Sequence, residues 1–432
     1  MDNFLPSELI ARLKETGDVE IVAGIPSYNN ARTIGQVVRA VAAGLGKYFP
    51  ECKAIIVNSD GGSKDGTHEA VLNAEVDHSA LFQVTHPVNP VRRITTAYAG
   101  IPGKGSAFRA IFAVAKHLNA KACVVVDSDL RSITPQWVEL LVRPVVDREF
   151  DFIAPYYLRH KYDGTITNSI IYPMTRAMFG QQVRQPIGGD FGISGKLAAR
   201  YLEKDVWETD VARFGVDIWM TLTAIAEGFR VGQSYLGAKL HDAKDPGADL
   251  TSMFRQVVGS LFGLMETYEK TWQSVAGSKA VPMFGFPFDV GLEPIPVNVE
   301  RMEHAFTQGT RDLREIYVEF LSPGTLAALA ECARAGDGVT FRLPDKLWVH
   351  TVYEFAAAYH RRAIDRDHLM QSLVPLYLGR TASFVLEVQE STALEVEERI
   401  EKLCEVFEAE KGYLAALWRA GAGKEKTHAG TV

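Results

Sequence analysis

The sequence predicts an α/β protein with a doubly wound sheet, followed by an all-helical C-terminal part. Short apolar segments rich in β-branched residues alternate with helical patterns over the first 280 residues, as in a parallel sheet flanked by helices. Polar, glycine-containing loops follow several of these segments, where open sheets of this class bind ligands. Beyond residue 300 the apolar residues recur at helical spacing.

Composition narrows the class of protein further. The 432 residues are 47% hydrophobic and 23% charged, as in globular proteins. A net charge of -7 without a Lys/Arg block argues against nucleic acid as the main partner. An N-terminus without a basic start and an apolar core, and the lack of an apolar run near 20 residues, predict a cytoplasmic chain with no membrane span. The four cysteines show no C-x-x-C spacing, so we expect reduced thiols and neither disulfides nor a zinc site: Cys52, Cys123, Cys332 and Cys404.

The predicted elements follow in chain order. We expect a short leading helix at residues 7–14, strands at residues 19–26, 54–57, 122–126, 152–157 and 234–241, and helices between these strands. In the C-terminal part we expect helices at residues 301–321, 326–335, 347–364, 368–378 and 393–418. The resulting division is a sheet domain at 1–280, a Pro/Gly-rich linker at 281–299, a helical domain at 300–420 and a disordered tail at 421–432.

The strand at 122–126 ends in two carboxylates, Asp127 and Asp129. Because they are spaced i, i+2, they lie on the same side of the strand end. Such a pair suits a hard cation that carries phosphate oxygens. The alternative is that one of them caps the helix beginning near Thr134 and Pro135.

Two glycine-containing loops are candidates for phosphate and nucleotide binding. Lys104 lies between two glycines just before a helix predicted at 107–118, where backbone donors, the helix dipole and a positive charge converge. A plain turn with a solvated lysine is the alternative. The loop at residues 58–67 is expected to offer unpaired backbone N–H groups to a ligand.

Three further residues are singled out by their positions. Asp190 follows two glycines, so that backbone and carboxylate line the same cleft. Asp217 lies in the first turn of a helix, where capping alone would also explain it. His241 ends a late strand, and a lone histidine is more often structural than a ligand.

Together these segments resemble the retaining GT-A glycosyltransferases, and most closely the glucosyl-3-phosphoglycerate and mannosyl-3-phosphoglycerate synthases. The resemblance covers about residues 19–268. It rests on five motifs in this order: Pro102-Gly103-Lys104-Gly105, Asp127-Ser128-Asp129, Gly188-Gly189-Asp190, Gly215-Val216-Asp217-Ile218 and His241.

The resemblance implies a role for each matching position. Asp129 and His241 would ligate Mg²⁺ or Mn²⁺. Lys104, Asp190 and Asp217 would be catalytic, facing the phosphates, the sugar and the acceptor. The acceptor would also contact Gly164, Thr165 and Thr167. The nucleotide sugar, with GDP or UDP as its nucleotide, would contact Pro26, Ser27, Tyr28, Asn30, Ser59, Lys104, Asp127, Ser128 and Gly189. Relatives carry an acidic residue where this chain has Asn30.

The implied reaction is metal-dependent transfer of glucose or mannose with retention of configuration. Relatives that use 3-phosphoglycerate carry an arginine two residues before a threonine, where this chain has Thr165 before Thr167. The missing bidentate phosphate contact predicts free D-glycerate as acceptor and glucosylglycerate as product. A phosphate site restored by Arg159, Lys161 or Lys244 would favour 3-phosphoglycerate instead.

Two other classes of function remain open at the level of sequence. A polyprenyl-phosphate sugar transferase would share the sheet domain, although the chain lacks a membrane span and a basic amphipathic stretch. A non-catalytic sugar-nucleotide-binding module would use the helical region to bind a partner. A second copy of the chain is a candidate partner for the amphipathic C-terminal helices.

Overall fold

The computed structural model describes residues 5–74, 92–97, 103–240, 251–287, 291–293, 295–334 and 341–422. The chain divides into two compact units, each built from several segments. The first, the sheet unit, comprises Met1–Leu158, Val183–Ala243 and Val281–Glu293. The second, the helical unit, comprises Arg159–Gln182, Lys244–Ala280 and Pro294–Val432. The ranges expected from the sequence are continuous domains, whereas each of these units is made of three separate segments of the chain.

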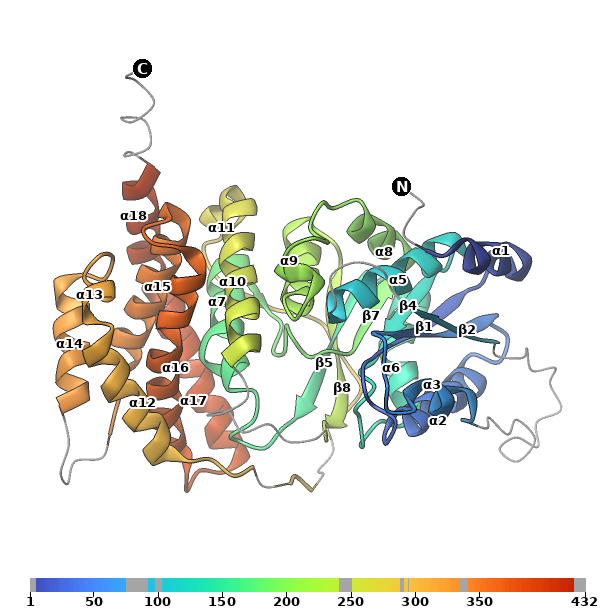
Figure 1. Ribbon diagram of the computed structural model, residues 1–432, viewed down its shortest axis with the longest axis horizontal. Coiled ribbons are helices and arrows are strands. Elements are labelled where there is room, and N and C mark those ends of the chain that lie inside the picture. The colour runs from blue at the N-terminus through green and yellow to red at the C-terminus, as the bar shows by residue number, and fades with distance from the viewer. Residues whose placement is uncertain are drawn as a thin grey trace, which may run out of the picture. The chain divides into compact units, whose positions relative to one another are not determined.

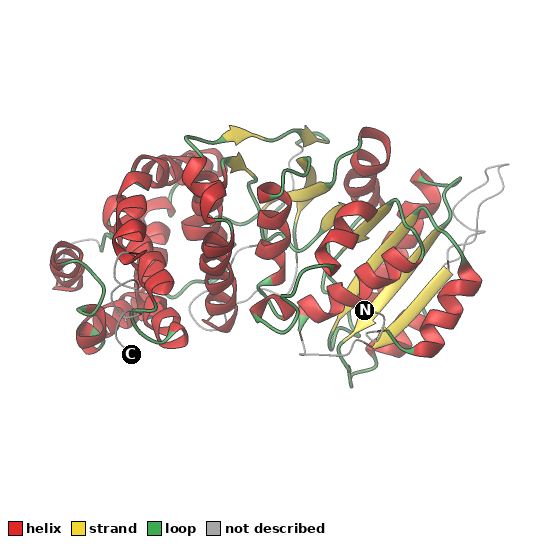
Figure 2. Ribbon diagram, turned by 90° about the horizontal axis from the view of Figure 1, so that it is seen from above, coloured by secondary structure: helices red, strands yellow, loops and turns green. Residues whose placement is uncertain are grey.

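The sheet unit is built on an eight-stranded mixed sheet with the strand order β10-β8-β5-β7-β4-β1-β2-β3. Figure 1 labels its strands β1, β2, β4, β5, β7 and β8, and Figure 2 shows strands as yellow arrows. The central strands are buried throughout, because helices cover both faces of the sheet. β7 is antiparallel to β4 and β5, while the other paired strands are parallel. The strands are β1 (Ile21–Ser27), β2 (Ala54–Asp60), β3 (Arg92–Ala97), β4 (Ala122–Val125), β5 (Phe152–Leu158), β7 (Phe191–Ser194), β8 (Val231–Ala238) and β10 (Met283–Phe284).

Helices lie on both faces of this sheet, which confirms the doubly wound architecture (Figure 1). α2 and α6 pack together over one face, and their apolar side chains form a core with β1 and β4. α5 and α8 pack together on the other face. The helices are α1 (Ser7–Thr16), α2 (Ile34–Tyr48), α3 (Thr67–Leu72), α5 (Lys104–His117), α6 (Pro135–Arg148), α8 (Gly195–Leu202), the 3₁₀ turn η2 (Asp210–Ala212) and α9 (Val216–Ala226).

The helical unit contains helices in each range expected beyond residue 300, together with earlier segments of the chain. The helices expected at 301–321 and 393–418 are each divided into two, α12 and α13 in the first range and α17 and α18 in the second. The pairs α12·α16, α15·α18 and α7·α17 pack against each other. Among the described residues no helix is long and apolar enough to cross a membrane. The elements are the π-helical turn η1 (Thr167–Ile171), α7 (Tyr172–Phe179), β6 (Gln181–Gln182), α10 (Thr251–Thr267), α11 (Glu269–Ser274), β9 (Lys279–Ala280), α12 (Val299–Asp312), α13 (Arg314–Tyr317), α14 (Pro323–Arg334), α15 (Asp345–Arg361), α16 (Arg366–Val388), α17 (Ala393–Ala409) and α18 (Lys411–Ala422).

Candidate active site

The sheet order gathers most of the predicted site residues. β4, β1 and β2 are neighbouring parallel strands, so their carboxyl ends meet at one edge of the sheet. Asp127 and Asp129 follow β4, Pro26 and Ser27 end β1, and Ser59 lies near the end of β2. The pairing of these strands is therefore enough to bring the five residues to the same edge of the sheet.

Lys104, the first residue of α5, forms ion pairs with Asp127 after β4 and with Asp217 at the start of α9. Its Nζ lies 2.8 Å from Asp127 Oδ1 and 3.1 Å from Asp217 Oδ2. Burial disfavours the charged form of Lys104, but the two carboxylates outweigh it and raise the pKa of the lysine. Burial also raises the pKa of Asp217, and the charge of Lys104 opposes this only in part. The lysine is thus held as a cation between two acids and is not a solvated turn residue.

The glycines around Lys104 have a packing role. A Cβ on Gly105 would lie 1.9 Å from the backbone oxygen of Val211, and one on Gly103 would lie 2.6 Å from that of Ala212. Gly105 also donates its N–H to the carbonyl of Arg213 at 3.2 Å. The turn before α9 therefore packs directly on the start of α5, and this close approach brings Lys104 to Asp217.

Lys239 is a site residue that the sequence reasoning missed. It follows β8 and is 8% exposed. Its Nζ donates to Asp127 Oδ2 at 2.8 Å, to Asp190 Oδ2 at 2.8 Å and to the Gly188 carbonyl at 2.7 Å. The available signal was a lysine at the end of a predicted buried strand, two residues before His241.

Asp190 is fully buried within the same network. It accepts hydrogen bonds from the backbone N–H of Asp127 at 2.7 Å and from the hydroxyl of Tyr157. Burial, together with the charge of Asp127, raises its pKa in spite of Lys239. Gly189 has a φ of +92°, and a Cβ there would lie 2.2 Å from Asp127 Oδ2, so this position must be glycine for the carboxylates to meet.

Asp127 is the acid that the two lysines share. Burial opposes its ionised form, yet Lys104 and Lys239 hold its pKa well below the usual range for a carboxyl. The alternative that Asp127 or Asp129 caps α6 is wrong, because the N-cap residue is Thr134 and no side chain caps this terminus. Asp127 therefore orients two cations at the end of β4.

The predicted nucleotide side has polar groups that already bond to one another. The Oδ1 atom of Asn30 accepts from Ser128 Oγ at 2.8 Å and from the Tyr28 N–H at 2.9 Å. Tyr28 is 62% exposed, so its ring is accessible at the end of β1. Ser59 is fully buried, and its Oγ has no hydrogen-bond partner among the described residues.

The loop after β2 differs from its prediction. Asp60 Oδ1 accepts from the backbone N–H groups of Gly62 and Ser63 at 2.9 and 2.8 Å, and Ser27 Oγ donates to Asp60 Oδ2 at 2.9 Å. The acidic side chain thus closes the turn internally. The expectation that these N–H groups are unpaired is wrong.

Of the two predicted metal ligands, the structure describes Asp129. Its carboxylate forms no hydrogen bond or ion pair with the part of the chain that the structure describes, so both oxygens are open to a hard cation. His241 lies outside the described residues. Within the described ranges no three His, Cys, Asp or Glu side chains form a group able to hold a metal.

The predicted acceptor contacts belong to both units, each of which is described on its own. Asp217 lies in the sheet unit, whereas Gly164, Thr165 and Thr167 lie in the helical unit. The hydroxyl of Thr165 lies 2.5 Å from the hydroxyl of Tyr377 in α16. Thr165 is buried, and its carbonyl accepts from Ser169 Oγ at 2.6 Å, so its hydroxyl and carbonyl are already engaged within the helical unit.

The two nearby cations are engaged in the helical unit. Arg159 Nη1 lies 3.1 Å from Asp163 Oδ2. Lys161 Nζ donates to carbonyl oxygens at the C-terminal end of α16, including Val388 O at 2.9 Å. Lys244 lies outside the described residues.

Comparison with known proteins finds similarity to glucosyl-3-phosphoglycerate synthases. No family profile matches the chain. The curated glucosyl-3-phosphoglycerate synthase of Petrotoga mobilis is 24% identical over 277 residues, which are 60% of this chain and 78% of that protein. Among solved structures, the glucosyl-3-phosphoglycerate synthase of Mycobacterium tuberculosis with Mn²⁺, uridine diphosphate and phosphoglyceric acid is 21% identical, with 59% of this chain and 81% of that chain covered and a TM-score of 0.42. Its complex with Mg²⁺ and uridine diphosphate is 20% identical, with 60% and 84% covered and a TM-score of 0.42.

Proposed function

We propose that this chain, which is similar to a curated glucosyl-3-phosphoglycerate synthase, is a glycosyltransferase that transfers glucose from a nucleoside-diphosphate glucose to D-glycerate. The product is glucosylglycerate, with the anomeric configuration of the donor retained. The observation that carries the transferase assignment is the buried network of Lys104, Lys239, Asp127, Asp190 and Asp217. The nucleotide is uridine diphosphate in the solved relatives, and we propose the same nucleotide here.

Lys104 stabilises the charge that develops on the departing diphosphate, while Lys239, whose Nζ already donates to three acceptors, holds Asp127 and Asp190 in place. Lys104 and Lys239 are buried cations whose positions are fixed by Asp127 before the donor binds, which is the preorganisation that favours a charged transition state. The bond from the anomeric carbon to the phosphate oxygen breaks while the acceptor oxygen attacks from the same face. The acceptor's proton passes to the departing phosphate.

Asp217 has one oxygen available for a substrate hydroxyl. Its Oδ2 contacts Lys104, while its Oδ1 is buried and has no hydrogen-bond partner among the described residues. A buried acceptor atom without a donor is costly, and a hydroxyl of a bound substrate would satisfy it. We assign Asp217 to acceptor orientation on this ground.

Asp129 has the chemistry of a ligand for a divalent cation. Its open carboxylate supplies hard oxygen ligands, and the solved relatives hold Mn²⁺ or Mg²⁺. Such an ion would supply positive charge and Lewis acidity to the diphosphate of the donor. We propose Asp129 and His241 as its ligands.

The preference for unphosphorylated glycerate rests on the residues around Thr165. No arginine stands at that position, and Arg159 and Lys161 are engaged by Asp163 and by α16. A phosphate dianion without its bidentate partner loses about ten- to a hundredfold in affinity. The second candidate acceptor is 3-phosphoglycerate, which the names of the relatives favour.

The test compares the two acceptors with one donor. We expect kcat/KM for D-glycerate to exceed that for 3-phosphoglycerate by about tenfold, because the phosphate lacks its charge-assisted contact. Initial rates with UDP-glucose and Mg²⁺ or Mn²⁺ measure this, and EDTA serves as the metal-free control. A preference of tenfold or more for 3-phosphoglycerate would overturn the assignment of glycerate. Absence of both transfer and donor hydrolysis would overturn the transferase itself. A cytoplasmic location and a homodimer stay predictions from the sequence.

A further inference from the structure

Residues 159–171, here called the acceptor segment, carry the predicted acceptor contacts and belong to the helical unit. The segment runs through Gly164 and Thr165 into the π-helical turn η1, a local distortion common at functional sites. Helices far later in the chain contact it at three places. These contacts are the basis of the inference.

The first contact is between Thr165 and Tyr377. Their hydroxyl oxygens are 2.5 Å apart, and the two residues are 3% and 2% exposed. Burial raises the pKa of Tyr377 to about 12, so the phenol stays protonated at neutral pH. The Tyr377 ring also packs on Phe254 of α10, with ring centroids 4.5 Å apart. Tyr377 is thus a fixed point to which the segment is bonded.

The second contact joins Lys161 to the end of α16. Its Nζ donates to the carbonyl oxygens of Val388 at 2.9 Å and Ser391 at 3.4 Å, and to that of Gln389. These carbonyls lie at the C-terminal end of the helix, where a cation also interacts favourably with the helix dipole. Lys161 therefore fastens the start of the acceptor segment to α16.

The third contact is made by Trp348 of α15. Its indole N–H donates to the carbonyl of Ser169 at 2.9 Å, and Ser169 Oγ in turn donates to the carbonyl of Thr165 at 2.6 Å. Since Trp348 is fully buried, this chain of bonds is sheltered from water. It links η1 and the loop before it to the core of the helical unit.

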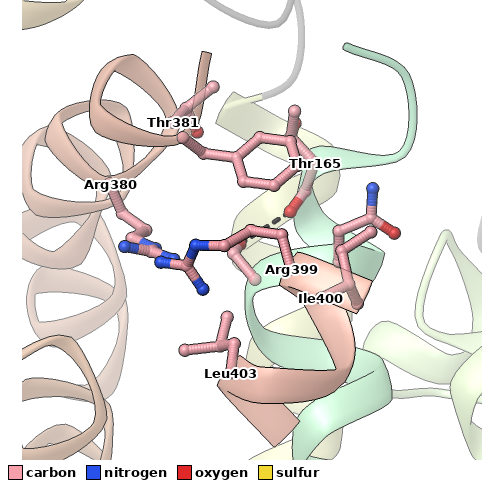
Figure 3. Close-up of a pocket in the computed structure, with 9 residues that line it drawn as sticks. Thr165, Arg380, Thr381, Arg399, Ile400 and Leu403 are labelled. Carbon is pink, nitrogen blue, oxygen red and sulfur yellow. Dashed lines mark hydrogen bonds between the residues drawn. The ribbon is translucent and has the colours of Figure 1, made fainter. Parts of the chain in front are cut away.

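Residues of the acceptor segment, α16 and α17 line a small pocket (Figure 3). Its two arginines do not form a site for an acceptor phosphate, because carboxylates already neutralise them. Arg399 Nη2 lies 2.6 Å from both Asp345 and Glu387, and Arg380 Nη2 lies 3.0 Å from Asp345. The residues that line the pocket are Thr165, Asn168, Ser169, Arg380, Thr381, Phe384, Arg399, Ile400 and Leu403.

We propose that Tyr377 and Lys161 are positioning residues, through which the C-terminal helices hold the acceptor segment in the geometry that binds the acceptor. The inference rests on the proposed function, and it assigns the helical unit the role of setting acceptor affinity. Donor binding and the charge network of the sheet unit do not depend on these two side chains.

Tyr377→Phe tests this with a matched control. The variant removes one hydroxyl, and Tyr317→Phe removes another equally buried hydroxyl, bonded to Ser372 O at 2.7 Å outside the segment. We expect Tyr377→Phe to raise KM for the acceptor about five- to tenfold, the worth of one hydrogen bond, with KM for the donor and donor hydrolysis unchanged. Tyr317→Phe should leave the acceptor KM unchanged. Lys161→Met should act like Tyr377→Phe, with Lys411→Met as its control, since Lys411 bonds Val275 O at 2.6 Å.

Hydrogen exchange gives a readout that does not depend on activity. Peptides covering residues 159–171 should exchange faster in Tyr377→Phe and Lys161→Met than in the two controls. Unchanged exchange, or an acceptor KM that shifts as much in Tyr317→Phe, would overturn the inference while the proposed function stands. Loss of transfer with every acceptor in the unmodified protein, together with faster exchange in the variants, would overturn the proposed function and leave the positioning contacts standing.

Discussion

At the residue scale, the site depends on how unlike charges are distributed among five buried side chains. The sequence identified four of them, because each follows a strand end, follows two glycines or begins a helix next to glycine: Lys104, Asp127, Asp190 and Asp217. It did not identify Lys239, since a lysine near a strand end is ordinarily exposed, and its burial follows only from the pairing of β8 with β5. Ion-pair geometry of this kind is a tertiary property.

The opposite pKa shifts of Asp127 and Asp217 lead to opposite effects of pH on stability. Asp127 has a lowered pKa in the folded protein, so its stabilisation is fully present above its unfolded pKa near 4 and is lost below it. Asp217 has a raised pKa, so the folded state binds more protons than the unfolded state above about pH 4, and stability falls as pH rises there.

Urea unfolding of two asparagine variants between pH 4 and 7.5 measures this contrast. Relative to the unmodified protein, Asp127→Asn should be destabilised by a constant amount across this range. Asp217→Asn should become relatively more stable as pH rises from 4, until the folded pKa of Asp217 is passed. Parallel curves for both variants would contradict the assigned directions.

At the element scale, the sequence predicts the long buried strands and the amphipathic helices, and it misses short strands such as β7 and β10. β7 has four residues directly after the Gly188-Gly189-Asp190 turn, too few for a periodic pattern. A Cβ on Gly192 in this strand would lie 1.9 Å from the backbone oxygen of Leu141 in α6. Glycine here permits the close approach of a helix, which no local pattern reveals.

A substitution at the start of α5 can test how far the site depends on the close packing of a glycine against a neighbouring backbone. Gly105→Ala would place a Cβ 1.9 Å from the Val211 oxygen, so the turn before α9 must shift and separate Lys104 from Asp217. We expect a loss of about 1–3 kcal/mol in unfolding free energy and a fall in kcat of about a hundredfold, as for a misplacement near 1 Å. Thermal unfolding and initial rates measure the two effects.

The control for this variant is another helical glycine. Gly46→Ala in α2 would meet nothing within 4 Å and should stabilise the protein by about 0.5–1 kcal/mol through helix propensity, with kcat unchanged. A Gly105→Ala variant that behaves like Gly46→Ala would show that the glycine beside Lys104 has no packing role.

At the scale of the whole molecule, the sequence predicts the helices of the C-terminal part but not the unit to which they belong. Chain order suggests a domain at 300–420, whereas the compact helical unit also takes Arg159–Gln182 and Lys244–Ala280. Ion pairs and ring contacts between residues far apart in the sequence hold these segments in the helical unit, and no local sequence pattern predicts them. Arg176 of α7, for instance, is bonded to Glu401 and Glu408 of α17.

Because the helical unit includes these earlier segments, we predict that residues 294–422 do not fold alone. Without α7, α10 and α11 the fragment would expose Trp418, which stands edge-on to Trp272 of α11 at 5.3 Å, and Tyr377, which packs on Phe254. Trp348 would lose its acceptor at Ser169, and Glu401 and Glu408 would lose Arg176. Burying one large aromatic side chain contributes about 1.5–3 kcal/mol, so these losses together exceed half of the 5–15 kcal/mol that stabilises a typical domain.

Circular dichroism of the fragment should therefore show helix without a cooperative thermal transition, while co-expression with residues 1–293 should recover a complex that melts cooperatively. A sharp transition in the isolated fragment would mean that the later helices form a domain of their own, and that the acceptor segment is held by something other than a shared core.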